Sequence, residues 1–221
     1  PSDGMIGQAK TQELRHGYYA CVSYIDALVG RLIRTMSKLN LSEETVICIW
    51  GDHGYHLGEQ GLWTKANNYE LSLRVPLIFS IPMQKNQGSK SHGLVELVDI
   101  YPSICEACKI EIPADLEGKS FVPLLNDPHK EWKKAAYSQF PRNRTGNRHS
   151  KHGDIMGYSV RTNTHRYTEW RDWKNNRLIN RELYDHRNDP REMTNIATIK
   201  ESQGQLKALN KVLNEGWKSL K

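Results

Sequence analysis

The chain has 221 residues, a formal net charge of +6, 38% hydrophobic residues and 25% charged residues. This composition excludes an intrinsically disordered chain, and no apolar run approaches the roughly 20 residues that are needed to span a bilayer. The length allows one large domain, or one domain with a small appendage.

The positive charge is concentrated in one stretch of the chain. Residues 129–191 hold 15 Lys and Arg against 7 Asp and Glu. The stretch could form a solvated basic surface, or a patch that attracts a polyanion. Nucleic acid is a poor candidate for that polyanion, because no helix-turn-helix, zinc-finger or aromatic RNA-binding signature accompanies the charge.

The first half of the chain predicts a long helix and two strands. Residues 11–39 carry apolar side chains at helical spacing, which predicts an amphipathic helix of about seven turns. The segments "TVICIW" (45–50) and "RVPLIFSIP" (74–82) are continuously apolar, as in strands buried on both faces. This succession of elements predicts an α/β domain with a parallel or mixed sheet.

The rest of the chain predicts a short helix and then a small antiparallel sheet. Residues 93–108 suit a short helix, and residues 111–125 suit a loop with two prolines. From about residue 132, short alternating runs rich in aromatic residues predict strands, and residues 162–165 suit a hairpin turn. A final helix is expected over about 200–220, with its apolar face formed by Leu206, Leu209, Leu213, Trp217 and Leu220. We therefore divide the chain into residues 1–131, an α/β part, and residues 132–221, an antiparallel-sheet subdomain.

The loop between the first two predicted strands, "WGDHGYHLGEQGLWTKANNYE" (50–70), gathers ionisable side chains. In α/β sheets, ligands bind at the carboxyl ends of strands, where Asp52 and His53 are expected. Carboxylate oxygens suit Ca²⁺ or Mg²⁺, and a histidine extends the choice to transition metals. The alternative is a strand-end turn in which Asp52 caps backbone N–H groups.

Other side chains of this loop suit an anion site. Lys65 follows Asp52 by 13 residues and could bring a compact positive charge to an oxyanion. His56 could donate a proton or a hydrogen bond near neutral pH. Glu59 could orient a metal ligand, or could equally form a plain salt bridge with Lys65.

The motif "GDHGYHLGEQGLWTK" followed by "RVPLIFSIP" resembles the C-terminal half of the type I sulfatases, within the alkaline phosphatase superfamily. The resemblance is strongest to the iduronate-2-sulfatase group. It covers nearly the whole chain, because "YYACVSYIDALVGRLI", "LVELVDIYPS", "LEGKSFVPLL", "YSQFPR" and "ELYDHRNDP" also resemble that group in the same order.

The resemblance implies part of a sulfatase-like central sheet flanked by helices, and it implies roles for matching residues. Asp52 and His53 correspond to ligands of a divalent cation, usually Ca²⁺, and Lys65 corresponds to the lysine that holds the sulfate group. Many arylsulfatases carry Asn in place of His53, so this histidine marks a subgroup. The resemblance also places three residues in the substrate-binding pocket: Tyr55, His56 and Arg142.

The family's nucleophile is a Cys or Ser, matured to formylglycine within a Cys/Ser-x-Pro-x-Arg motif, and this motif has no match here. The segment Ser138–Arg142 has one residue too many before its proline. The early paired aspartates of the family are also missing, and the sequence begins Pro-Ser-Asp without a signal peptide. We therefore expect the C-terminal part of a sulfatase, whose site is completed by an N-terminal half of the same enzyme.

The substrate class remains open at this point. A sulfated glycan, such as one containing iduronate-2-sulfate, would explain the basic balance of residues 129–191. A phosphonate monoester or phosphodiester hydrolase of the same superfamily, with a similar "DHG…K" loop, is one alternative. A non-catalytic polyanion-binding module is another. By resemblance alone, the enzyme is expected in the periplasm, outside the cell or in the lysosome.

Overall fold

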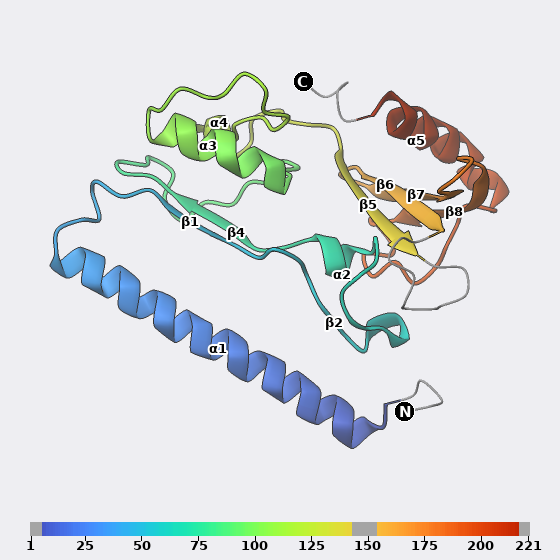
Figure 1. The fold of residues 1–221 in the computed structure, drawn as a ribbon, viewed down its shortest axis with the longest axis horizontal. Coiled ribbons are helices and arrows are strands. Elements are labelled where there is room, and N and C mark those ends of the chain that lie inside the picture. The colour runs from blue at the N-terminus through green and yellow to red at the C-terminus, as the bar shows by residue number, and fades with distance from the viewer. Residues whose placement is uncertain (1–5, 143–153, 217–221) are drawn as a thin grey trace.

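Two groups of strands and a long first helix organise the molecule, which is described here from a computed structural model (Figure 1). The structure describes residues 6–142 and 154–216. Its helices are α1 (Gln8–Lys38), α2 (Glu70–Leu73), α3 (Ile100–Ala107), α4 (Val122–Asn126) and α5 (Gln203–Glu215). Its strands are β1 (Ile47–Trp50), β2 (His56–Leu57), β3 (Trp63–Thr64), β4 (Leu77–Ser80), β5 (Ala136–Arg142), β6 (Ile155–Arg161), β7 (His165–Asp172) and β8 (Leu178–Asp185).

The helix predicted over residues 11–39 is confirmed as α1, but other described residues leave much of its apolar face uncovered. Val22 is 54% exposed and Leu32 is 67% exposed, and no residue of the helix is buried. Figure 1 shows α1 lying along one side of the molecule. Neither α1 nor any other described helix combines the length and apolar character required to cross a membrane.

Strands β1 and β4 form at the predicted positions, but the prediction that they are buried on both faces is wrong. They pair antiparallel, with Cys48 opposite Phe79, which a mixed sheet allows and an all-parallel sheet does not. Ile78, which alternates with the core-facing Leu77 and Phe79, is 59% exposed. Side chains alternate along a strand. One face of the pair therefore packs against α3 and α4, while the opposite face is uncovered in the described part of the chain.

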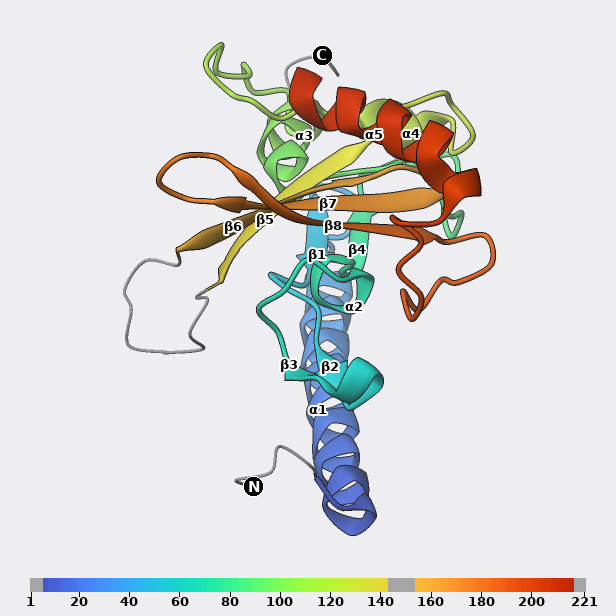
Figure 2. The same ribbon diagram turned by 90° about the vertical axis from the view of Figure 1, so that its right-hand side faces the viewer.

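The antiparallel sheet predicted from residue 132 onwards is confirmed, with strand order β5-β6-β7-β8. The turn between β6 and β7 is the predicted hairpin, closed by a 2.8 Å hydrogen bond from the backbone N–H of Thr162 to the carbonyl of His165. Figure 2 shows the sheet between two layers, with α5 on one face and the loop that carries α2 on the other.

The core of this sheet lies under α5. Leu206 and Leu209 of α5 are buried and pack against Val160, Tyr167 and Leu183 of the sheet. This packing confirms the predicted apolar face of the last helix as far as Leu213. Two further residues predicted on that face, Trp217 and Leu220, lie outside the described residues.

Buried ion pairs join the two parts of the chain near residue 132. The Lys133 ammonium lies 2.9 Å from a Glu96 carboxylate oxygen and 2.7 Å from an Asp99 oxygen, and its side chain is 6% exposed. The Glu96 carboxylate also accepts a 2.8 Å hydrogen bond from the backbone N–H of Tyr137 in β5. The start of the sheet is thereby held against the turn that precedes α3, and a domain boundary between residues 131 and 132 stays a prediction.

Candidate functional site

The loop from β1 to β4 folds back tightly on itself. The backbone N–H of Gly54 donates to the carbonyl of Ser72 over 2.8 Å, and β2 and β3 form a two-residue hairpin. Gly54 passes so close to Leu71 that a Cβ atom at this position would lie 2.0 Å from the Leu71 carbonyl oxygen. Only glycine fits at this crossing, which fixes the path of the chain just after Asp52 and His53.

We expect Gly54→Ala to destabilise the protein by about 1–3 kcal/mol, the usual cost of inserting atoms into a filled space. The obstacle is a backbone carbonyl, so no side-chain rotation can relieve the clash. Gly51→Ala is the matched control, because a Cβ there would meet its nearest neighbours at 3.4 Å, an ordinary contact. Denaturant unfolding of both variants checks this, and equal losses of unfolding free energy would contradict it.

The structure brings together the three residues predicted to bind metal and sulfate. The His53 Nε2 atom lies 3.6 Å from an Asp52 carboxylate oxygen and contacts the Lys65 ammonium. The Asp52 side chain is 83% exposed and that of His53 is 32% exposed. A carboxylate, an imidazole and an ammonium group therefore meet at an accessible position of the loop.

The hydrogen bonding of His53 assigns its tautomer. Its Nδ1 atom lies 2.8 Å from the Gly54 carbonyl oxygen, which can only accept, so Nδ1 carries the proton. The lone pair then sits on Nε2, the atom that faces Lys65 and Asp52. Metal-binding histidines characteristically donate one ring N–H to a carbonyl or carboxylate and bind the metal through the other nitrogen, which in His53 is the Nε2 atom that contacts Lys65. The residues therefore fit a divalent cation, and Asp52 and His53 would supply two of its ligands.

The backbone on both sides of Lys65 is in a left-handed conformation. Thr64 has a φ of 73° and Ala66 a φ of 87°, values that are rare for residues other than glycine and especially for a β-branched residue. Such conformations cost about 1–3 kcal/mol each and persist where surrounding contacts hold them. Here the adjoining Asn68 side chain donates a 3.1 Å hydrogen bond to the carbonyl of Gly157 in β6.

The other predicted site residues make contacts elsewhere. The His56 ring is fully buried, and its Nε2 atom lies 3.1 Å from the Asn67 side-chain amide nitrogen. Tyr55 packs against Tyr18 of α1, with ring centroids 5.2 Å apart. Arg142 lies over the Trp170 ring, 4.5 Å from its centroid.

Glu59, which was expected either to orient a metal ligand or to pair with Lys65, has another partner. Its carboxylate accepts a 2.7 Å hydrogen bond from the backbone N–H of Leu57. The Glu59 side chain therefore closes its own turn, within the part of the loop that joins β2 to β3.

Sequence reasoning missed a buried cluster beside the loop, formed by Glu70, Arg161, Arg166, His186 and Glu192 and named here the Glu192 cluster. The side-chain ligand atoms of Glu70, His186 and Glu192 lie within 4.8 Å of one another, as in a metal site. Arg166 Nε, however, lies 2.6 Å from a Glu192 oxygen, and Arg161 Nε lies 3.1 Å from a Glu70 oxygen. Two guanidinium groups thus balance two carboxylates, so the arrangement is better explained as an ion-pair network than as a cation site.

The arginines also control the charge of Glu70. Burial alone would raise the pKa of this carboxyl group, because a buried charge is poorly solvated. The Arg166 and Arg161 guanidiniums outweigh the effect of burial and hold the pKa of Glu70 below its ordinary value. Glu70 is therefore ionised at neutral pH and stays paired.

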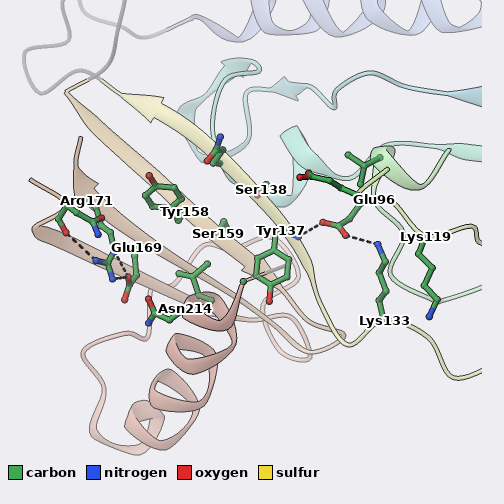
Figure 3. Close-up of a pocket in the computed structure, with 16 residues that line it drawn as sticks. Glu96, Lys119, Lys133, Tyr137, Ser138, Tyr158, Ser159, Glu169, Arg171 and Asn214 are labelled. Atoms are coloured by element: carbon green, nitrogen blue, oxygen red, sulfur yellow. Dashed lines mark hydrogen bonds and ion pairs between the residues drawn. The ribbon is translucent and has the colours of Figure 1, made fainter. Parts of the chain in front are cut away.

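A cavity of about 680 Å³ lies between the sheet, α5 and the turn before α3 (Figure 3). Its wall contains carboxylates that already have partners: Glu96 is paired with Lys133, and Glu169 with Arg171. It is lined by none of residues 50–70. The cavity is therefore separate from the group formed by Asp52, His53 and Lys65.

Family models match the chain in two overlapping stretches. The model "N-sulphoglucosamine sulphohydrolase, C-terminal" matches residues 58–219, and the model "Sulfatase" matches residues 3–110. Together they cover the loop and both groups of strands.

Individual relatives agree with these models. An N-acetylglucosamine-6-O-sulfatase of Bacteroides thetaiotaomicron is 32% identical over 96% of this chain, and human iduronate 2-sulfatase is 31% identical over 72%. The chain spans 37% and 38%, respectively, of the length of these two proteins.

Solved structures share the fold. One, of a protein in complex with its substrate D-glucosamine-2-N,6-O-disulfate, has a TM-score of 0.83 and 30% identity, and covers 96% of this chain and 43% of that one. A phosphonate monoester hydrolase from Silicibacter pomeroyi has a TM-score of 0.82 at 21% identity, over 96% of this chain and 42% of that one, which shows a common fold alone. Because the C-terminal family model spans most of the chain and the relatives agree with it, the chain belongs to the sulfatase family.

Proposed function

We propose that this chain supplies the cation-binding and sulfate-binding residues of an enzyme that hydrolyses sulfate esters on a sulfated glycan. The observation that carries the proposal is the meeting of Asp52, His53 and Lys65 in one exposed group, although Lys65 is 13 residues from Asp52 in the sequence. Asp52 and His53 would hold a divalent cation, Ca²⁺ or Mg²⁺, and Lys65 would bind the sulfate group.

Lys65 suits this role because its ammonium offers three hydrogen-bond donors and no acceptor. Negative charge builds up on the sulfuryl oxygens during ester cleavage, and a fixed positive charge stabilises it most where it is already in position. A bound divalent cation would add Lewis-acid stabilisation of the same oxygens. The carbonyl of Gly54 keeps the His53 ring oriented, so that its Nε2 lone pair stays on the side of Asp52 and Lys65.

For the rest of the substrate, we propose contacts from Tyr55 and Arg142. The burial of His56 favours a supporting role through Asn67 over direct contact with substrate. The positive balance of residues 129–191 supports a polyanionic substrate. An iduronate-2-sulfate or a glucosamine sulfate unit is the proposed point of attack, by analogy with the named activities of the relatives.

The whole enzyme is proposed to include an N-terminal part that supplies the nucleophile and the remaining cation ligands. The apolar faces of α1 and of the β1–β4 pair, which the described residues leave largely uncovered, offer this part a surface on which to pack. Residues 1–131 would then belong to its catalytic α/β domain, and residues 132–221 would form a subdomain. We propose a periplasmic, extracellular or lysosomal location, in keeping with a glycan substrate.

The test is hydrolysis of an aryl sulfate and of a glucosamine 6-sulfate disaccharide by the intact enzyme, with and without a chelator. We expect chelation to abolish turnover and added Ca²⁺ or Mg²⁺ to restore it. The 221-residue chain alone is expected to be inactive, because it contains no activated nucleophile of the family type. Faster turnover of a phosphonate monoester than of either sulfate would favour the phosphonate hydrolase alternative. Glycan binding without any turnover by the intact protein would favour a binding module.

A further inference from the structure

We propose that Glu192 is a positioning residue: together with Arg166 and Glu70, it holds the loop segment that carries Lys65 in its working position. The inference rests on the proposed role of Lys65 as the sulfate-binding cation. It assigns a function to the Glu192 cluster. Arg161 and Arg166 of the cluster lie opposite each other on β6 and β7 and alternate with Val160 and Tyr167, which pack under α5, so the two arginines lie on the other face of the sheet. Figure 2 shows the loop that carries α2 on that face.

The Glu192 carboxylate is held by three polar contacts. One carboxylate oxygen accepts from Arg166 Nε over 2.6 Å and lies 2.8 Å from His186 Nε2. The other accepts from the backbone N–H of Glu70 over 2.7 Å. The side chain is 1% exposed, and the residue has a φ of 55°, in the left-handed region that favours glycine. Because such a backbone persists only where neighbours hold it, these contacts point to a specific requirement for Glu192.

Glu70 connects the cluster to the loop. It is the first residue of α2, directly after the segment that carries Lys65. Its carboxylate receives Arg166 Nη2 over 2.5 Å and Arg161 Nε over 3.1 Å. Arg166 therefore bridges the carboxylates of Glu70 and Glu192, and the C-terminal end of the loop is fixed to strands β6 and β7.

Residues 191 and 192 also hold the N-terminal end of the segment that carries Lys65. The Gln60 side-chain amide donates to the carbonyls of Arg191 and Glu192, each over 2.9 Å. Gln60 itself has a φ of 56°. Residues 60 and 70 are thus both attached to residues 191–192, with Lys65 midway between them. The left-handed backbone of Thr64 and Ala66 lies inside this closed segment, where the two attachments resist its relaxation.

Charge makes this attachment sensitive to a single substitution. The Arg166 side chain is only 3% exposed. Its guanidinium charge is therefore stabilised by the two carboxylates and not by water. Glu192→Gln keeps the shape of the side chain but leaves Arg166 with one carboxylate fewer. Removing one partner of a buried pair leaves an uncompensated charge, which the structure relieves by admitting water or by moving. The segment from Gln60 to Glu70 is the part that would move.

The experiment compares Glu192→Gln with Glu169→Gln in the intact enzyme. Glu169 is the matched control because its carboxylate is also buried and paired with an arginine, Arg171, but it faces α5 through Asn210 and not the loop. We expect Glu192→Gln to lower kcat for sulfate ester hydrolysis by about 10- to 100-fold, the scale that a displacement of about 1 Å produces. We expect Glu169→Gln to lower Tm while kcat of the folded enzyme stays within about two-fold, since its partners do not include the loop.

Two further measurements separate positioning from a general loss of structure. Amide hydrogen exchange in peptides covering residues 60–70 should be faster in Glu192→Gln and unchanged in Glu169→Gln. Gln60→Ala removes only the attachment of residue 60 to residues 191–192. It should increase the exchange of residues 60–70 and lower kcat, each by less than Glu192→Gln does. It replaces Glu192→Gln as the test if that variant does not fold. If Glu192→Gln or Gln60→Ala folds and shows unchanged amide exchange and unchanged kcat, the inference is overturned.

A double substitution distinguishes failure of this inference from failure of the proposed function. If Glu192 acts through Lys65, Glu192→Gln combined with Lys65→Ala should be no slower than Lys65→Ala alone, because the two losses overlap. Additive losses would overturn the positioning role while leaving Lys65 as a sulfate-binding residue. Normal turnover of Lys65→Ala would instead refute the proposed function, and the exchange of residues 60–70 would still report whether Glu192 holds the segment.

Discussion

If Lys65 binds the sulfate group as proposed, replacing it by alanine in the intact enzyme is expected to lower kcat by about 100- to 1,000-fold, the usual loss when one preformed contact to a developing oxyanion is removed. Cation affinity should not fall, because the ammonium is not a metal ligand. Any change should be an increase, because the substitution removes a positive charge that contacts His53 Nε2 and would repel a cation there. Steady-state kinetics and calorimetric titration with Ca²⁺ measure the two quantities.

Two variants sharpen this test. Lys65→Arg should not restore full activity, because a planar guanidinium replaces a compact point charge between the left-handed residues Thr64 and Ala66. Lys207→Ala, at an exposed position on α5, controls for loss of a surface charge and should leave kcat unaltered. Near-normal turnover of Lys65→Ala would mean that this side chain belongs to the scaffold.

Replacing Asp52 by alanine should weaken divalent cation binding and turnover together, since a charged oxygen ligand is lost. Outer-sphere partners of metal ligands alone are worth about 10- to 100-fold in affinity, so removal of a direct ligand is expected to exceed that range. Raising the Ca²⁺ concentration should recover part of the turnover of Asp52→Ala, and none of that of Lys65→Ala. This difference in rescue separates a metal ligand from a sulfate contact.

The competing explanation for Asp52 gives a different result. Its Oδ1 atom accepts a 3.1 Å hydrogen bond from the backbone N–H of His53, as a turn-capping residue would. If capping were its whole role, Asp52→Ala would cost about 1 kcal/mol of unfolding free energy, and cation affinity would not change. An unchanged affinity in the Ca²⁺ titration would therefore reject the metal site.

Much of the fold could be predicted because its patterns are local. The spacing of apolar residues located α1, and the alternation of aromatic residues located the strands of the second sheet, with the packing face at Leu206 and Leu209. Pairing direction is not a local property. The apolar runs of β1 and β4 suggest burial on both faces, whereas in this chain Ile78 faces outward from an antiparallel pair.

The candidate site was predictable to the extent that it lies in one segment. Asp52, His53 and Lys65 share a loop whose motif is distinctive, and they meet in the structure. The burial of His56 could not be foreseen, because a histidine beside Asp and His resembles a functional residue whether it faces solvent or Asn67. The Glu192 cluster could not be predicted from the sequence, because each of its charged residues, taken alone, resembles a solvated surface residue.

The bond between Glu192 and the backbone of Glu70 joins residues 122 positions apart. Contacts of such long range form late, because the intervening chain loses much conformational entropy before they can stabilise anything. During synthesis, the segment that carries Lys65 would leave the ribosome well before strands β6 to β8 and the turn at residues 191–192 exist. We therefore expect this segment to reach its final conformation only after the C-terminal sheet has folded. A chain stalled before residue 192 would contain Asp52, His53 and Lys65 and still be unable to hold Lys65 in place.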